Sequence, residues 1–90
     1  MSRLRMKFVG KKTVTDSNNN KIVNFEVQDI LDVKTGKKIA KSYLFGNAKQ
    51  FRDANYKSGD IVELNANISD NNGKINIYNY FGLELVKWII

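Results

Sequence analysis

Apolar and polar residues alternate with a period of two along most of this 90-residue chain. Near the N-terminus the apolar set is Leu4, Met6 and Phe8, and the intervening basic set is Arg3, Arg5 and Lys7. Successive side chains of a β-strand point to opposite faces, so this pattern describes a strand with one apolar and one basic face. The chain is therefore predicted to be all-β, with one short helix where the apolar spacing changes to three residues.

Five strands and one helix follow from the alternation and from the turn residues between alternating segments. The first strand is expected to include the alternating segment Arg3 to Phe8, ahead of a loop at Thr15 to Asn20. The other strands are expected at about Lys21 to Leu31, Lys38 to Phe45, Ile61 to Ser69 and Lys74 to Leu85, and the helix at Ala48 to Asn55. Asn72-Gly73 suits a two-residue hairpin turn. Asn47 is a candidate N-cap for the helix, whose buried stripe is predicted to be Ala48, Phe51 and Ala54.

The same alternation sorts the larger side chains between core and surface. The predicted core set is Val23, Phe25, Val27 and Leu31, with Phe45, Phe51 and Phe81. On the last strand, Tyr78 and Tyr80 are expected to share one face with Asn76, and Gly82 to mark a bulge or bend.

Length and hydropathy favour one domain covering residues 1–90, because a chain this short rarely divides further. The N-terminus has basic residues but no apolar run of the kind that secretory signals carry. No segment reaches the roughly 18 consecutive apolar residues of a membrane span. A cytoplasmic protein is the expectation.

The balance of charge is basic, with 15 Lys and Arg against 9 Asp and Glu, giving a net charge of +6. A small basic domain favours polyanions, either nucleic acid or an anionic membrane surface. The alternative is that these charges serve solubility. We expect nucleic acid and no membrane.

Catalysis and metal binding have little support in this sequence. It contains no His and no Cys, which removes the usual general base and the common transition-metal ligands. The spacing of Asp16, Asn18 and Asn20 imitates a calcium loop, but Lys21 stands where that loop requires Gly and Val27 where it requires Glu. No enzyme activity, cofactor or metal is expected.

The order of three strands, a helix and two strands is that of the five-stranded OB barrel. The segment Lys57-Ser58-Gly59-Asp60-Ile61-Val62-Glu63-Leu64 resembles the basic-x-Gly-Asp-x-Val-x-Leu entry to strand four that recurs in OB-fold proteins. In size and charge the chain is similar to small OB-fold single-stranded DNA-binding proteins of phages, plasmids and other mobile elements. The resemblance implies a closed OB-like barrel that binds single-stranded DNA without sequence specificity in replication or recombination. The apolar and basic end, 86–90, differs from the acidic tail of the bacterial housekeeping single-strand binder.

Single-strand binders stack bases on aromatic rings beside a basic groove. In an OB barrel the ligand crosses strands two and three, flanked by the loops between strands one and two and between strands four and five. The predicted nucleic-acid-binding residues are Arg3, Arg5, Lys7, Lys34, Lys37, Lys38, Lys41, Tyr43, Lys74, Tyr78 and Tyr80. The alternative for each tyrosine is cross-strand packing, and for each lysine protection of a sheet edge.

Two further functions stay open at this point. OB barrels also bind RNA. The chain could instead be a protein-interaction subunit that docks a partner through its apolar end, Trp88, Ile89 and Ile90, since exposed apolar patches usually make contacts. That end could equally form a homodimer, contact a replication protein or pack back on the barrel.

Overall fold

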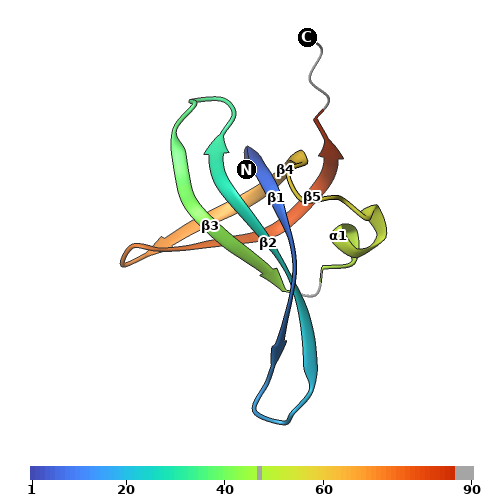
Figure 1. Cartoon of the computed structure of the whole chain (residues 1–90). Coiled ribbons are helices and arrows are strands. Elements are labelled where there is room, and N and C mark those ends of the chain that lie inside the picture. The colour runs from blue at the N-terminus through green and yellow to red at the C-terminus, as the bar shows by residue number, and fades with distance from the viewer. Residues whose placement is uncertain (47, 87–90) are drawn as a thin grey trace.

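The computed structural model describes residues 1–46 and 48–86, which form five strands and one helix. The strands are β1 (Ser2–Thr15), β2 (Lys21–Asp32), β3 (Lys38–Gly46), β4 (Ile61–Asn71) and β5 (Lys74–Leu85), and the helix is α1 (Lys49–Ala54). The predicted order of elements is confirmed, with α1 between β3 and β4 (Figure 1). The strand pairs are antiparallel, as expected for an all-β chain. Among the described residues, no helix has the length and apolar character needed to cross a membrane.

The five strands form one sheet in the order β3-β2-β1-β4-β5, so β3 and β5 are its edges. The predicted closed barrel is therefore not formed, because closure would need a backbone ladder between β3 and β5. A side chain stands between the two edges instead. The Tyr43 hydroxyl of β3 accepts a hydrogen bond from the Ile77 N–H of β5 at 3.0 Å and lies 3.3 Å from the Ile77 carbonyl oxygen. Because a tyrosine side chain fills this seam, the two backbones are too far apart to pair there.

The edge strand β5 is covered at a second point by the helix. The Gln50 Nε2 of α1 donates a hydrogen bond to the Tyr80 carbonyl oxygen at 3.2 Å. Unpaired strand edges can pair with other chains, and natural proteins cover or interrupt them. In this protein side chains from β3 and α1 take the place of a fifth ladder, between β3 and β5.

The core lies on the inner face of the curved sheet and is closed at one end by α1. Phe51 of α1 is fully buried, with ring centroids 4.9 Å from Phe45, 5.6 Å from Phe25 and 6.0 Å from Phe8. The other buried residues come mainly from β1, β2 and β4. They are Leu4, Met6, Val27, Ile30, Ala48, Val62, Leu64, Ala66 and Ile77. Stacked and tilted aromatic pairs of this kind stabilise a core beyond their buried area.

The predicted helix is confirmed but is shorter than expected. Ala48 occupies the N-cap without a side-chain hydrogen bond, and Asn55 ends the helix in the left-handed conformation. Ala54 was predicted to belong to the buried stripe of the helix but is exposed. The helix has only six residues, and Phe51 is the one that it buries against the sheet. The predicted N-cap, Asn47, lies outside the described residues.

A bulge in β2 shifts the alternation of that strand. Asp29 has a φ of +54°, and the pairing with β1 changes register at this point. Ile30 is consequently fully buried, whereas Leu31, which was predicted to be in the core, is only half-buried. The prediction from alternation fails here because the extra residue of the bulge turns the side chains that follow it to the opposite side of the sheet.

A second bulge, at Asn79 in β5, has the same effect on the aromatic residues. Asn79 has a φ of +52°, and three steps along β5 match two along β4. Tyr80 therefore turns inward, 4.9 Å from the Phe45 ring, while Phe81 is 49% exposed. The predictions that Tyr78 and Tyr80 share a face and that Phe81 belongs to the core are both wrong for this reason.

The predicted irregularity at Gly82 is confirmed. Its φ is +69°, a conformation that favours glycine, and the pairing of β4 with β5 shifts again at this position. A Cβ at Gly82 would lie 3.0 Å from the Asn65 Nδ2. Glycine thus allows β5 to pass close to the outer side chains of β4.

Beyond the core, β1 and β2 continue as a two-stranded hairpin that extends away from the rest of the molecule (Figure 1). β1 runs to Thr15, beyond the alternating segment Arg3 to Phe8 and up to the start of the predicted loop. At the hairpin tip the Asp16 carboxylate accepts hydrogen bonds from the backbone N–H groups of Asn18 and Asn20, each at 2.9 Å. The hydrogen bond from the Asn20 N–H is the largest of the effects that lower the pKa of Asp16. The Asn-rich segment is a turn, as predicted.

Candidate nucleic-acid interface

The outer faces of β1, β2 and β3 form a surface of three residue rows, which we call the β1–β3 outer face. Paired across the strands, the rows are Lys7–Gln28–Ser42, Gly10–Glu26–Leu44 and Lys12–Asn24–Gly46. The β2 residues between these rows, Phe25 and Val27, are buried, so the rows themselves point away from the core. Lysines of β1 therefore stand at both ends of this surface.

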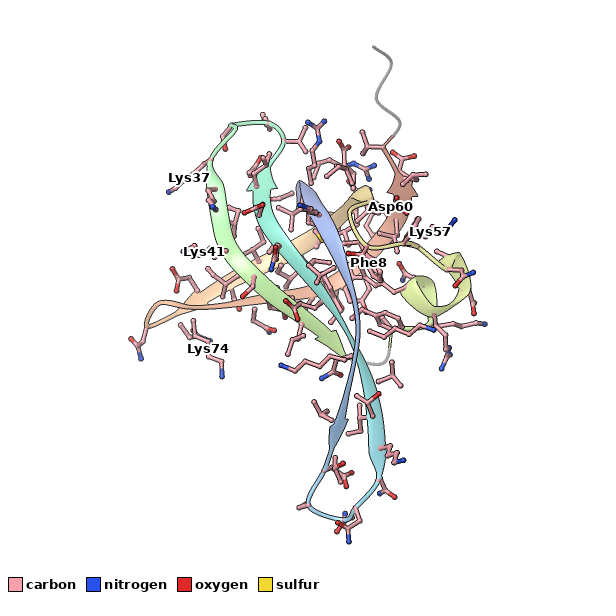
Figure 2. All side chains as sticks on the ribbon, viewed as in Figure 1. Phe8, Lys37, Lys41, Lys57, Asp60 and Lys74 are labelled. Atoms are coloured by element: carbon pink, nitrogen blue, oxygen red, sulfur yellow. The ribbon has the colours of Figure 1, made fainter. Side chains whose placement is uncertain are left out.

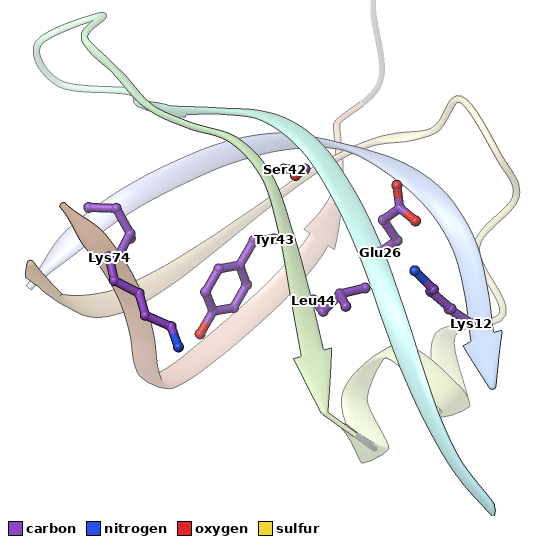
Figure 3. A pocket seen from close by; sticks show the side chains of 7 residues that line it. Lys12, Glu26, Ser42, Tyr43, Leu44 and Lys74 are labelled. Carbon is purple, nitrogen blue, oxygen red and sulfur yellow. The ribbon is translucent and has the colours of Figure 1, made fainter. Parts of the chain in front are cut away.

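A groove of about 400 Å³ lies along the β3 side of this face and reaches the β4–β5 hairpin (Figure 3). Its lining is Lys12, Glu26, Ser42, Tyr43, Leu44, Lys74 and Ile75. An adjoining hollow shares its apolar lining and adds Asn71 and Asn76. The groove thus combines two lysines, one carboxylate and three side chains with apolar surface, which is a lining able to contact both bases and phosphates.

Tyr43 has a different position from the one predicted for a base-stacking residue. Its ring is half-buried and packs edge-on against Phe45, with 4.9 Å between centroids. Its hydroxyl lies 3.1 Å from the Asn76 Oδ1 and also bonds the backbone of Ile77. Tyr43 therefore forms the floor of the groove at the seam between β3 and β5.

Three predicted lysines lie at the β1–β3 outer face or at its border, and a fourth lysine adds to them. Lys7 begins one row, Lys74 lines the groove, and Lys41 lines a neighbouring hollow with Ser42. Lys12 was not predicted, because it lies beyond the segment Arg3 to Phe8 in which the alternation was recognised. Within residues 1–46 and 48–86, these four lysines make no ion pair.

The turn between β2 and β3 carries the remaining predicted lysines. Lys34 and Lys37 are exposed there, and Lys38 pairs with Asp29 at 3.5 Å. Figure 2 shows Lys37 in the turn before β3, Lys41 on β3 and Lys74 beside the β4–β5 hairpin, on the side of the molecule away from α1. This flank continues the basic surface of the β1–β3 outer face.

Arg3 and Arg5 lie further along β1, over β4 and β5, and both are engaged by carboxylates. The Arg3 Nε is 3.1 Å from the Glu63 Oε1, and the Arg5 Nη2 is 2.7 Å from the Glu63 Oε2. Arg3 also pairs with Glu84 and donates to the Gly82 carbonyl oxygen at 3.3 Å. The structure thus separates these two predicted cations from the lysines and ties them into the fold.

Glu63 is the centre of this ion-pair cluster. Its side chain is only 13% exposed, and burial alone would raise its pKa. The hydrogen bonds and charges of Arg5 and Arg3 outweigh burial and hold the pKa of Glu63 below its ordinary value. The carboxylate is therefore ionised at neutral pH and cancels much of the local positive charge.

Tyr78 and Tyr80 are separated by the Asn79 bulge. Tyr78 is 40% exposed and shares the outer face of β5 with Asn76, which lines the groove. Tyr80 packs against Phe45 and Phe51, and burial raises its pKa, with a smaller contribution from Tyr43. Of the three predicted tyrosines, Tyr78 is the one that offers an open ring to a ligand.

Comparison with protein-family models, with curated proteins and with solved structures finds no match for this chain. The predicted interface residues Trp88, Ile89 and Ile90 lie outside the described residues. Within the described ranges, no three acidic side chains are close enough together to hold a metal ion. The chemistry of the candidate site must therefore be inferred from the β1–β3 outer face itself.

Proposed function

We propose that this protein binds single-stranded DNA without strong sequence specificity, through the β1–β3 outer face and its groove. The proposal is carried by one observation: four lysines without ion pairs among the described residues lie on one side of the molecule, two of them lining a groove with apolar surface and two beside it. Cations that make no internal pairs are available to phosphates. The order of strands and helix is also that of an OB fold, although the sheet is open.

An unpaired strand suits this surface better than a duplex. Leu44 and Ile75 offer apolar contact in the groove, and Tyr78 offers an exposed ring beyond it. Bases can reach such groups only when they are not stacked and paired inside a helix. We therefore expect phosphates at Lys7, Lys12, Lys41 and Lys74, and bases against the apolar lining and Tyr78.

Fluorescence anisotropy tests this proposal with a labelled oligothymidylate of about 20 nucleotides, its duplex form and the matching RNA. The single-stranded DNA should bind most tightly. Roughly four phosphate contacts predict a loss of affinity of about 50-fold between about 50 and 200 mM salt. A flat titration at the lower salt would reject the proposal, and tighter binding of the RNA would change the ligand to RNA.

A second candidate function, docking of a protein, is favoured by a different surface. Phe81 and Leu85 of β5 are 49% and 42% exposed. Phe81 lies beside the Arg3–Glu84 pair, where opposite charges cancel and a polyanion gains little. Sedimentation velocity of the protein alone, and of a Phe81→Ser variant, separates the two candidates. If the wild type self-associates and Phe81→Ser does not, while both still bind the oligonucleotide, then the surface at Phe81 docks a protein and the β1–β3 outer face binds DNA.

A further inference from the structure

Glu26 is the one acidic side chain in the groove lining and occupies the middle row of the β1–β3 outer face. Its neighbour on β3 is the exposed Leu44, and its neighbour on β1 is Gly10. Lys7 and Lys12 begin the rows on either side. A carboxylate in a groove flanked by unpaired lysines is not explained by attraction of a polyanion, so it needs a separate account.

The surroundings of the Glu26 carboxylate leave it free to meet a ligand. No ion pair or hydrogen bond of its side chain occurs among residues 1–46 and 48–86, and the residue is half-buried. A Cβ placed on Gly10 would meet nothing within 4 Å, so the space beside Glu26 on the β1 side is open. Figure 3 shows Glu26 between Lys12 and Leu44, with its carboxylate reaching out from β2.

A bound single strand would bring both repulsive and attractive groups to this position. Phosphates are repelled by a carboxylate, whereas base edges with exocyclic amino groups donate hydrogen bonds to it. Cytosine offers its N4 amino group at the position where uracil and thymine carry a carbonyl oxygen. Lys7 and Lys12 can hold phosphates on both sides, which leaves a base to face Glu26.

Resting on the proposed function, we propose that Glu26 is a specificity-determining residue that selects a base bearing an exocyclic amino group over uracil or thymine. The carboxylate accepts a hydrogen bond from the amino group of the selected base. Against uracil it faces the O4 oxygen, so two acceptors repel each other and a polar group goes unpaired.

Deoxycytidine and deoxyuridine oligonucleotides of equal length are the sharpest ligand pair, because their bases differ only in the groups that exchange hydrogen bonds. Anisotropy titrations of the wild-type protein should give about tenfold tighter binding to oligo-dC than to oligo-dU. Glu26→Gln keeps the shape of the side chain but presents both a donor and an acceptor. This variant should bind oligo-dU more tightly than the wild type does and should reduce the preference to about twofold or less.

Asp29→Asn is the matched control. It also removes one negative charge beside the β1–β3 outer face, from an exposed carboxylate in the hollow next to Ser42, and asparagine tolerates the positive φ at this position. This variant should strengthen binding of both oligonucleotides equally and keep the preference for oligo-dC. A change of preference in Asp29→Asn as large as in Glu26→Gln would show that charge alone acts, and would overturn the inference.

The remaining outcomes separate the two proposals. Equal affinity of the wild-type protein for oligo-dC and oligo-dU overturns the role of Glu26 and leaves the proposed function standing. Absence of binding to either oligonucleotide at low salt overturns both. Thermal melting of Glu26→Gln by circular dichroism should match the wild type, since the Glu26 carboxylate makes no ion pair or hydrogen bond with residues 1–46 or 48–86 that the substitution would remove.

Discussion

One strand carries basic residues into two different environments. Where β1 pairs with β4, Arg3 and Arg5 meet Glu63 and are held in ion pairs. Where β1 pairs with β2, Lys7 and Lys12 stand opposite Gln28 and Asn24, which carry no charge. The first pair of cations stabilises the fold, and the second is available to a ligand.

The net charge of this chain therefore does not locate a binding surface. A charge of +6 is a property of the whole chain, while the register between strands decides which cations have partners. The Glu63 carboxylate is only 13% exposed and lies between two guanidinium groups, so removing it should destabilise the fold. Substitutions in the region over β1, β4 and β5 should therefore change the stability of the fold, whereas substitutions on the β1–β3 outer face should change ligand binding.

The largest effect is expected from Glu63→Gln, which leaves Arg3 and Arg5 without their shared carboxylate. The free energy of unfolding should fall by about 2 kcal/mol, because two partly buried charges lose a charged partner. Urea denaturation followed by circular dichroism measures it. Glu84→Gln is the control, since Glu84 is mostly exposed and Arg3 is its one ion-pair partner among the described residues, and it should cost about 0.5 kcal/mol or less. Equal effects of the two variants would contradict a central role for Glu63.

The next effect is expected in binding, from the double substitution Lys7→Ala and Lys12→Ala. Affinity for single-stranded DNA should fall about tenfold, and the slope of its salt dependence should decrease by roughly 1 to 2. Lys49→Ala with Lys57→Ala removes the same charge near α1, away from the face, and should change neither value appreciably (Figure 2). If both double variants weaken binding equally, total charge rather than the β1–β3 outer face governs affinity.

A smaller effect is expected at the seam beside the groove, which no backbone ladder supports. Tyr43→Phe removes the hydroxyl that bonds Ile77 and Asn76, and it should lower the free energy of unfolding by about 1 kcal/mol. Tyr78→Phe removes the hydroxyl of an exposed ring for which no side-chain hydrogen bond is found among the described residues, and it should leave stability unchanged. Chemical denaturation of both variants checks this difference. A Tyr43→Phe protein with the free energy of unfolding of the wild type would show that water can replace the hydrogen bonds of the Tyr43 hydroxyl.

The smallest effect is expected in the pH dependence of stability. The folded-state pKa of Glu63 lies below its ordinary value, because the bonds from Arg5 and Arg3 outweigh the opposing effect of burial. The contribution of ionised Glu63 to the free energy of unfolding is therefore complete above the unfolded-state pKa of about 4.3. It is lost as the pH falls through the lower, folded-state pKa.

The stability advantage of the wild type over Glu63→Gln should accordingly shrink between neutral pH and strongly acidic pH. Urea midpoints of both proteins measured across that range isolate this group, since every other carboxylate is common to them. A difference that stays constant down to the lowest pH would mean that charge on Glu63 does not stabilise the fold.

Much of the fold could be predicted from local patterns. The alternation of apolar and polar residues predicted all five strands. The turn predicted at Asn72-Gly73 forms, with positive φ at both residues. The Lys57 to Asp60 turn also forms, with the Asp60 carboxylate accepting from the Lys57 N–H at 2.9 Å. These features depend on neighbours in sequence, which is why a single sequence predicts them.

Features that depend on distant strands could not be predicted in this way. The bulges at Asp29 and Asn79 reverse the alternation, and no residue type marks them uniquely. The open seam depends on one tyrosine side chain reaching a strand 34 positions away in sequence. Within the candidate site, lysines could be nominated by type, but the pairing of Arg3 and Arg5 with Glu63 needs the β1–β4 register.

The most direct test of the proposed interface is a titration of the isotope-labelled protein with a short single-stranded oligonucleotide, followed residue by residue in amide NMR spectra. The largest shifts should occur at Gln28, Ser42, Leu44 and Lys74, with small changes at Arg3 and Glu63. Shifts centred on Arg3, Arg5 and Glu63, with the β1–β3 outer face unperturbed, would contradict the assignment.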